Sequence, residues 1–229
     1  METSDGSILL LTLRVAAVST LLILPVAVGV AWFLARRAGP GRTLAETILS
    51  LPLVLPPTAV GLLLLEALRR SGPLGRLLDR AGIEIVFTWK AVVLATAVMS
   101  FPLLVRPVRA AFEEVDPRLL AMARSLGHTP LQAFRRVALP LSWRGILAGT
   151  LLAFSRALGE FGATILIAGN IPGRTQTLAL AIFQRTQIGA DGAALRLVAV
   201  TVVLAFVTVW TTEIITRHKA RTRAGERPA

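Results

Sequence analysis

The chain has 229 residues, 54% of them hydrophobic, a formal net charge of +12 and a mean hydropathy of +0.69, which predicts an integral membrane protein instead of a soluble domain. It has no cysteine, and its two histidines, His128 and His218, lie in arginine-rich polar segments, so disulfides, thiolate chemistry, a metal site and a cofactor are not expected. Its 25 Lys and Arg residues are scattered along the ends of apolar runs, which indicates membrane anchoring and no nucleic-acid partner.

Five apolar runs are long enough to cross a hydrocarbon core of about 30 Å, which takes about 20 residues. They cover residues 8–35, 44–68, 87–105, 146–168 and 197–215. The first run is too long for a signal peptide, and the leader before it, METSDGS, carries two acids and no Lys or Arg, so we expect it to stay attached. The sequence therefore predicts one all-α, polytopic transmembrane domain over residues 1–229.

The orientation follows from the basic residues between the spans. Segments 36–43, 106–145 and 216–229 together hold 15 Lys and Arg residues, and the segments on the opposite side hold 7. The first set is predicted to be cytoplasmic, with the amino terminus outside and the carboxy terminus inside, in the cell (inner) membrane. One segment disagrees, because the four arginines of RRSGPLGRLLDR would lie outside, where Asp79 and Glu84 offset them only in part.

The second span contains three prolines within six residues. Pro52, Pro56 and Pro57 remove backbone donors, and lipid offers no replacement for the hydrogen bonds that are lost. The broken backbone is therefore expected to face protein or a water-lined cavity, which makes this segment a candidate lining of a path. A packing kink is the alternative, as it is for Pro25 in the first span.

Residues 116–140 form the one long arginine-studded stretch, with clear helix signals. Asp116 can cap a first helix, which Gly127 ends in a left-handed conformation. Thr129–Pro130 repeat the start signal for a second short helix, which Pro140 is expected to close. A helix of about three turns is not stable alone in water, so another surface must cover it.

The first of these helices has one apolar face. Leu119, Met122, Ala123 and Leu126 recur at helical spacing, whereas Arg118 and Arg124 point elsewhere. Two partners remain open for this face. It packs either on the membrane ends of the chain's own spans or on a soluble protein.

The fourth span carries two charges near its middle, where a lone charge costs at least about 3 kcal/mol. Arg156 and Glu160 are four residues apart and can pair on one helix face, although Arg before Glu is the less favourable order. A structural pair and a role in a translocation path both remain open. In the same span Gly145, Gly149, Ala153 and Ala157 form a small-residue ridge, expected to be buried between helices or at a dimer seam.

The stretch AMARSLG followed by VALP resembles the "EAA" loop of ABC-transporter permeases, with Gly127, Leu139 and Pro140 in register. The resemblance implies that segment 113–140 is a cytoplasmic coupling loop, whose helix sits in a cleft of an ATP-hydrolysing subunit. One departure is the acid of the family pattern, which is replaced here by Leu120-Ala121. Its salt bridge must be absent, or supplied by Glu113, Glu114 or Asp116.

The resemblance extends over nearly the whole chain. LPLVLPPTAVG, AVMSFPLLVRPVR, LAFSRALGEFGATI and GNIPGRTQT are similar to the molybdate permeases of the compact five-span form, and more weakly to sulfate/thiosulfate and tungstate permeases. A type I ABC importer permease fold and an ATP-driven oxyanion importer are implied, with molybdate as the first cargo and sulfate, thiosulfate or tungstate as alternatives. The candidate path residues are Pro56, Pro57, Ser100, Arg156, Glu160 and Thr164, with Thr150 and Ser155 as further hydroxyls.

The expected partners follow from these features. The chain has no G-x-x-x-x-G-K-[ST] loop, because Lys90 follows Trp and Lys219 follows His, so the chain is not expected to be an enzyme. Five spans are few to enclose a path, which predicts a homodimer in membrane lipid with the conduit on its two-fold axis. The resemblance adds two ATP-binding subunits and a periplasmic or surface-tethered oxyanion-binding protein. Loop 169–196, with Asn170, Arg174 and Arg185, is the expected dock for that protein.

Three other classes fit less well. An intramembrane enzyme needs a His, a Cys or paired carboxylates at membrane depth, and Glu160 has no second acid in its span. A membrane scaffold leaves Arg156 and Glu160 without a role. A proton-coupled carrier is disfavoured because the five spans show no obvious internal repeat.

Overall fold

The computed structural model describes residues 4–224, and this part of the chain is all helix with no strand, as predicted. The end of segment 216–229, predicted to be cytoplasmic, and the first residues of the leader METSDGS lie outside the described residues. The long helices are α1 (Asp5–Ala35), α2 (Pro40–Val54), α3 (Pro57–Leu68), α5 (Trp89–Glu113), α9 (Trp143–Leu158), α11 (Leu178–Gln187) and α12 (Asp191–Ala224). The short helices are α4 (Gly75–Arg80), α6 (Pro117–Ser125), α7 (Pro130–Ala133), the π-helix η1 (Phe134–Ala138), α8 (Leu139–Leu141) and α10 (Gly162–Ile167).

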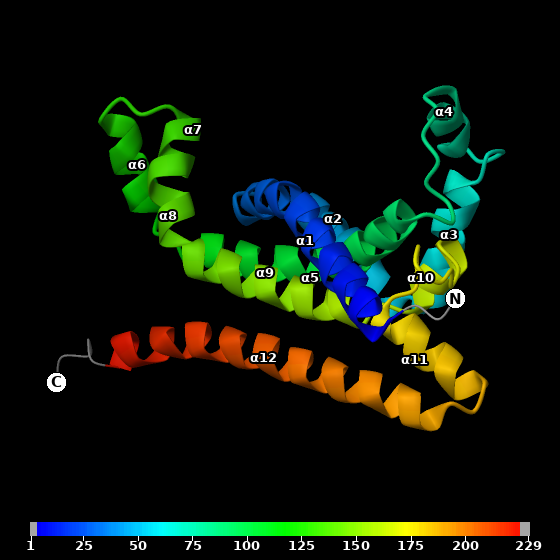
Figure 1. The fold of residues 1–229 in the computed structure, drawn as a ribbon. Coiled ribbons are helices and arrows are strands. Elements are labelled where there is room, and N and C mark those ends of the chain that lie inside the picture. Colours follow the sequence, from blue (N-terminus) through cyan, green and yellow to red (C-terminus); the bar gives the residue numbers. More distant parts are fainter. Residues whose placement is uncertain (1–3, 225–229) are drawn as a thin grey trace.

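Helix α5 is the centre of the bundle, with α1 and α9 packed along it (Figure 1). Of the most apolar stretch of α5, 67% is buried, against 33% in α1 and 11% in α12. Outer α12 exposes large apolar side chains along most of its length, including Val203, Phe206 and Trp210. This gradient is the one expected of a helical protein whose outer surface faces lipid.

The small-residue ridge of α9 explains how closely α9 approaches α5. A Cβ on Gly145 would collide with Ala111 of α5, and a Cβ on Gly149 would lie 3.0 Å from the Leu104 carbonyl oxygen. Ala153 and Ala157 of the same ridge are also buried. The predicted burial between helices is thus confirmed, and the partner of the first half of the ridge is α5 of the same chain.

The predicted span 44–68 is bent, and a second bend lies just before the predicted span 146–168. Three helices, α1, α5 and α12, are long and apolar enough to cross a membrane unbroken. The pair α2 and α3 bends by 107°, and the segment Pro130–Leu141 bends by 71° against α9, so the number rises to five if each bent pair is one span. The fourth span itself breaks between α9 and α10, at Gly159–Phe161.

The bend between α2 and α3 follows from local sterics. A residue that precedes proline is pushed out of the helical region. Leu55 precedes Pro56, and Pro56 precedes Pro57, so two consecutive residues adopt extended ψ angles of 143° and 132°. Pro52 lies inside α2 without ending it. The break predicted for this span is therefore made by Pro56 and Pro57.

Candidate functional site

Residues 116–142 form an arm that stands away from the bundle and comprises α6, α7, η1 and α8 (Figure 1). Its helix signals are those predicted. The Asp116 side chain accepts a hydrogen bond from the Arg118 amide at 2.8 Å, and Gly127 has a φ of +85°. The Thr129 hydroxyl and the Gln132 side chain form a reciprocal capping box. The start and the turn of the arm are therefore fixed by its own sequence.

Pro140 does not close the second helix as predicted. The helix runs on to Leu141, and the corner lies at Ser142, because the wider π turn η1 changes the hydrogen-bond register before the proline. The Leu139 amide donates to the Phe134 carbonyl, five residues back. Ser142 is buried, and its hydroxyl donates to the Ala111 carbonyl of α5 at 3.1 Å. This corner residue was missed, and only its place between a helix-end proline and an apolar run could have indicated it.

The inner side of the arm packs on the chain's own spans. Leu120 and Ala123 are buried between α6 and the α7–η1 segment, in the same apolar cluster as Leu34 of α1 and Phe112 of α5. An aromatic cluster joins α1, α5 and η1, with ring centroids 5.3 Å apart between Trp32 and Phe112, and 4.9 Å apart between Trp32 and Phe134. Ala123, one residue of the predicted apolar face, therefore packs inside the chain. Leu120, which was not part of that face, packs there as well.

The outer side of the arm exposes large apolar side chains to solvent. Leu119, Met122 and Leu126 of the predicted face are exposed, Leu126 by 79%, and Leu131 of α7 is exposed beside them. Arg118, Met122 and Leu126 line a shallow cleft of about 440 Å³ on this side. Exposed apolar groups at this density on a projecting arm mark an interaction surface. Arg124 and Gly127 are exposed as well, whereas Leu139 is half-buried and Pro140 exposed near the corner.

A second candidate site lies where α3 crosses α10, and we call it the broken crossing: residues 56–61 and 156–164. A Cβ on Gly61 would lie 2.6 Å from the Ala163 carbonyl oxygen, and a Cβ on Gly162 would lie 2.7 Å from Cβ of Pro57. Each helix thus presents a glycine to the other at the point where its own span is interrupted. The LPP and GEFGA segments, about 100 residues apart, meet here, and neither glycine was singled out as a contact from the sequence.

Arg156 and Glu160 form the predicted ion pair at the broken crossing, with 2.7 Å between Arg156 Nη2 and Glu160 Oε2. Glu160 is 2% exposed, and its other carboxylate oxygen accepts from the Ala163 amide at 2.9 Å, at the free end of α10. Within the described residues, one carboxylate oxygen thus accepts a hydrogen bond, whereas the other lies at ion-pair distance from Arg156 without a hydrogen bond. The Arg156 side chain is 28% exposed, so the cation of the pair is the member that an ion from outside can reach.

The structure brings together only some of the candidate path residues. Pro57 contacts the crossing at Gly162, and Pro56 is exposed at the break. Ser100 of α5 and Thr164 of α10 are buried, and within the described residues neither hydroxyl has a hydrogen-bond partner. Such orphaned hydroxyls are uncommon, because a buried polar atom without a partner costs free energy. In the part of the chain that the structure describes, no hydrogen bond joins these hydroxyls to Arg156.

At the opposite end of the bundle (Figure 1), α4 and the loops around it form a cap, residues 69–88, which we call the outer cap because it lies away from the arm. Arg70 pairs with Glu84 at 2.7 Å and approaches Asp79 at 3.7 Å, while Arg69 pairs with Glu66 at 3.0 Å. Two of the four arginines that disagreed with the predicted orientation are thus paired with nearby acids.

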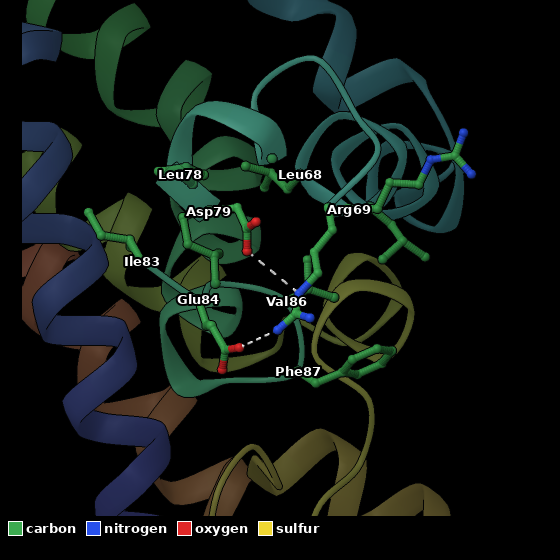
Figure 2. Close-up of a pocket in the computed structure, with 12 residues that line it drawn as sticks. Leu68, Arg69, Leu78, Asp79, Ile83, Glu84, Val86 and Phe87 are labelled. Carbon is green, nitrogen blue, oxygen red and sulfur yellow. Dashed lines mark hydrogen bonds and ion pairs between the residues drawn. The ribbon is translucent and has the colours of Figure 1, made fainter. Parts of the chain in front are cut away.

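Residues of the outer cap line a pocket of about 420 Å³, and Figure 2 shows Leu68, Leu78, Ile83, Val86 and Phe87 around it, together with Asp79 and Glu84, the two acids that pair with Arg70. Phe87 has a φ of +59°, which is unusual for a residue with a side chain, and its amide donates to the Ile167 carbonyl at 3.1 Å. The cap is therefore tied to the end of α10, next to the broken crossing.

Loop 169–177 is a polar turn held by internal hydrogen bonds. The Thr175 hydroxyl accepts from the Ile171 amide, and the Leu178 amide donates to the Thr12 hydroxyl of α1 at 2.9 Å. Two of the residues predicted to dock a partner are engaged inside the chain, since Asn170 donates to Gln184 and Arg185 pairs with Asp5. Arg174 is exposed and lines a cleft of about 480 Å³ with Lys90 and the cap acids.

Comparisons with known proteins cover nearly the full chain. A family described as "Binding-protein-dependent transport system inner membrane component" matches residues 23–221. The molybdenum transport system permease protein ModB of Escherichia coli K12 is 45% identical over 218 residues, which is 94% of this chain and 95% of that protein. The sulfate transport system permease protein CysT of Salmonella typhimurium LT2 is 42% identical over 157 residues, 69% of this chain and 57% of that protein.

A solved structure has a similar fold. A chain in the crystal structure of a bacterial alginate ABC transporter, in complex with a pentasaccharide-bound periplasmic protein, has a TM-score of 0.71 at 20% identity, covering 94% of this chain and 80% of that chain. At this identity the likeness concerns the arrangement of the helices alone.

Proposed function

The chain belongs to the family of binding-protein-dependent transport system inner membrane components, and from this membership we propose that it is the permease subunit of an ATP-driven oxyanion importer whose cargo is molybdate. The observation that supports molybdate as the cargo is the 45% identity to a molybdenum transport permease, which extends over 94% of the chain. Sulfate is the second candidate, since a sulfate permease is 42% identical over a shorter stretch.

The energy for transport comes from a separate subunit in this proposal. The chain has no phosphate-cradling lysine loop of its own, so ATP must be hydrolysed by a partner. The apolar outer side of the arm, with Leu119, Met122 and Leu126, is the surface we assign to that ATPase. Two ATPases on a homodimer of this chain would draw two arms together on binding ATP, and so open the path outward.

The anion path is assigned to the broken crossing. A dianion meets a barrier of tens of kcal/mol in bare hydrocarbon, so a polar route is obligatory. Arg156 is the attractive group, because its side chain stays partly exposed while Glu160 is enclosed. Two copies of the crossing, facing each other across a two-fold axis, would line one conduit. An oxyanion-binding protein would deliver the ion at the end that carries the outer cap and Arg174.

Transport of radiolabelled oxyanions tests the cargo. The chain is reconstituted in proteoliposomes with an ATPase subunit and an oxyanion-binding protein, and uptake of molybdate is measured against sulfate at equal concentration. ATP-dependent uptake of molybdate, with sulfate competing weakly, is the expected result. Preferred uptake of sulfate would move the assignment to the second candidate. Uptake of neither would overturn the proposed function.

Labelling of single cysteines tests the orientation, and the chain suits it because it has no cysteine. Ser125→Cys on the arm and Arg174→Cys on the outer loop both change exposed residues. A membrane-impermeant maleimide should label Arg174→Cys in intact spheroplasts, and Ser125→Cys only after lysis. The reverse pattern would place the arm outside and remove the ATPase from the proposal.

A further inference from the structure

Helix α2 is held to the bundle in an unusual way. The structure describes all of its residues, from Pro40 to Val54, and none of them is buried. Several of its large apolar side chains are exposed, including Leu44, Ile48 and Val54. Ala45 and Leu49 of α2 are half-buried against the apolar core, so apolar packing holds α2 only along a narrow stripe, and polar contacts with α5 add to it.

Those polar contacts form a closed set of four charges, which we call the Arg–Glu ring: Arg42 and Glu46 of α2, and Arg109 and Glu113 of α5. Within α2, Arg42 Nε lies 2.6 Å from Glu46 Oε1. Within α5, Arg109 Nε lies 3.8 Å from Glu113 Oε1. Between the helices, Arg42 pairs with Glu113 and Arg109 pairs with Glu46. Each arginine thus contacts both acids.

The ring fixes one register between the two helices. The pairs Arg42 with Glu113 and Glu46 with Arg109 run in opposite directions along the chain, so α2 and α5 are antiparallel here. A slip of one turn either way would place Arg42 opposite Arg109, or Glu46 opposite Glu113, and like charges repel at this distance. A hydrogen bond of 2.8 Å from Arg106 Nη2 to the Ser50 hydroxyl continues the ladder one turn further.

The position of the ring in the chain connects the arm to the broken crossing. Glu113 is the last residue of α5, three residues before Asp116, which caps the arm. Glu46 lies in the helix that ends at the Pro56 break, beyond which α3 contacts Ala163 at the crossing. The ring side chains are 23 to 34% exposed, so water screens them only in part.

We propose that the Arg–Glu ring is a register lock that makes α2 follow the arm end of α5, so that movement of the arm reaches the broken crossing. The proposal rests on the proposed function, and it assigns Arg42, Glu46, Arg109 and Glu113 as positioning residues. A displacement of the end of α5 either carries α2 along or forces the like-charge contacts of a slipped register. The second outcome is unfavourable, so α2 moves with α5.

Exchanging the charges distinguishes a register lock from a simple staple, by which we mean an attraction that holds α2 to α5 without selecting one register. Glu46→Arg alone breaks the ring. Glu46→Arg with Arg109→Glu restores attraction between the helices, but both slipped registers then also place opposite charges face to face. The fourfold exchange, which adds Arg42→Glu and Glu113→Arg, restores the attraction together with the repulsion in the slipped registers. A lock requires the fourfold exchange, whereas a staple requires only the double exchange.

The measurement is the amount of radiolabelled molybdate transported per ATP hydrolysed, in proteoliposomes that hold the full complex. We expect Glu46→Arg and the double exchange to lower this ratio by about tenfold, within the usual range of coupling between sites, with ATP hydrolysis retained. The fourfold exchange should bring the ratio back to within about twofold of the unaltered chain. Equal recovery by the double and fourfold exchanges would overturn the lock and leave a staple.

A second measurement tests the proposal even if the charge variants fail to insert into the membrane. Ser50→Cys with Arg106→Cys introduces the only two cysteines of the chain, at the hydrogen-bonded end of the ladder. Bridging them with a short bis-maleimide fixes the register covalently. Transport should survive bridging if α2 rides with α5, and its loss with ATP hydrolysis retained would contradict the proposal. Absence of molybdate and sulfate uptake by the unaltered complex is a different result, which would count against the proposed function itself.

Discussion

The arm and the broken crossing place side chains in opposite, unfavourable surroundings. The arm exposes Met122 and Leu126, which are apolar, at a polar end of the molecule. The crossing encloses Glu160, which is charged, near the middle of a predicted span. The crossing compensates internally, because Arg156 and the Ala163 amide engage both carboxylate oxygens. The outer side of the arm has no such compensation within the described residues, so it requires another molecule.

This difference predicts that changes at the crossing act on stability, whereas changes on the outer side of the arm act on assembly. The largest expected effect is that of Arg156→Leu. Removing the cation leaves Glu160 buried and uncompensated, which should lower the free energy of unfolding by about 3 to 5 kcal/mol. Unfolding in detergent is measured by urea titration. Arg156→Leu with Glu160→Gln should recover a large part of the loss, and a loss as great in the double variant would show that the pair itself is not the cause.

Gly61→Ala should have the next largest effect. The new Cβ would lie 2.6 Å from the Ala163 carbonyl oxygen, and overpacking of this kind costs about 1 to 3 kcal/mol. The same titration measures it. Gly29→Ala is the matched control, because Gly29 also lies inside a helix and a Cβ there meets nothing within 4 Å. Equal stability of the two variants would contradict the close crossing of α3 and α10.

Ser142→Ala tests the joint between the arm and the bundle. Its hydroxyl donates a buried hydrogen bond to the Ala111 carbonyl, and losing such a bond costs about 0.5 to 1.5 kcal/mol. Protease sensitivity of the arm should rise while the transmembrane bundle unfolds nearly as before. Ser125→Ala is the control, since the Ser125 hydroxyl is exposed and bonds only within α6. Unchanged proteolysis of Ser142→Ala would mean that the corner is held by packing alone.

Leu126→Ser should have the smallest effect on stability and a large one on assembly. Leu126 is 79% exposed, so the free energy of unfolding should change by less than about 0.5 kcal/mol. Co-purification of the ATPase from detergent should fall strongly. Leu120→Ser, one helix face away and buried, should instead destabilise the arm itself. Retention of the ATPase by Leu126→Ser would show that this face is not its dock.

Much of the fold followed from patterns that are local in the sequence. Apolar length predicted the helices, and the signals at Asp116, Gly127 and Thr129 were confirmed because caps and turns act within a few residues. The pairing of Arg156 with Glu160 was also local, one helical turn apart. Contacts between distant segments could not be obtained in this way.

The missed features share that long-range character. Gly61 meets Ala163 across about 100 residues of chain, and Arg42 meets Glu113 across 71. The helix end predicted at Pro140 is an exception, because the cause of the difference is local. A proline usually marks a helix end, but a π turn one step before it, at residues 134–138, allowed the helix to continue to Leu141. Arg185 in loop 169–196 was also expected to contact a binding protein, but it forms an ion pair with Asp5 of the first helix.

The π turn fixes the direction, about the helix axis, in which the side chains of α7 point. Each residue of an α-helix turns the chain by about 100°, so the wide turn at residues 134–138 determines where the side chains of α7 point relative to Ser142. Deleting one residue there would rotate Leu131 and the rest of α7 about the helix axis, whereas α6 stays joined to α5 through residues 114–116, so the contact between α6 and α7 would have to change. The distance between the arm tip and the bundle would hardly change. The length of this short segment, more than the identity of its side chains, therefore sets the direction in which α7 presents Leu131.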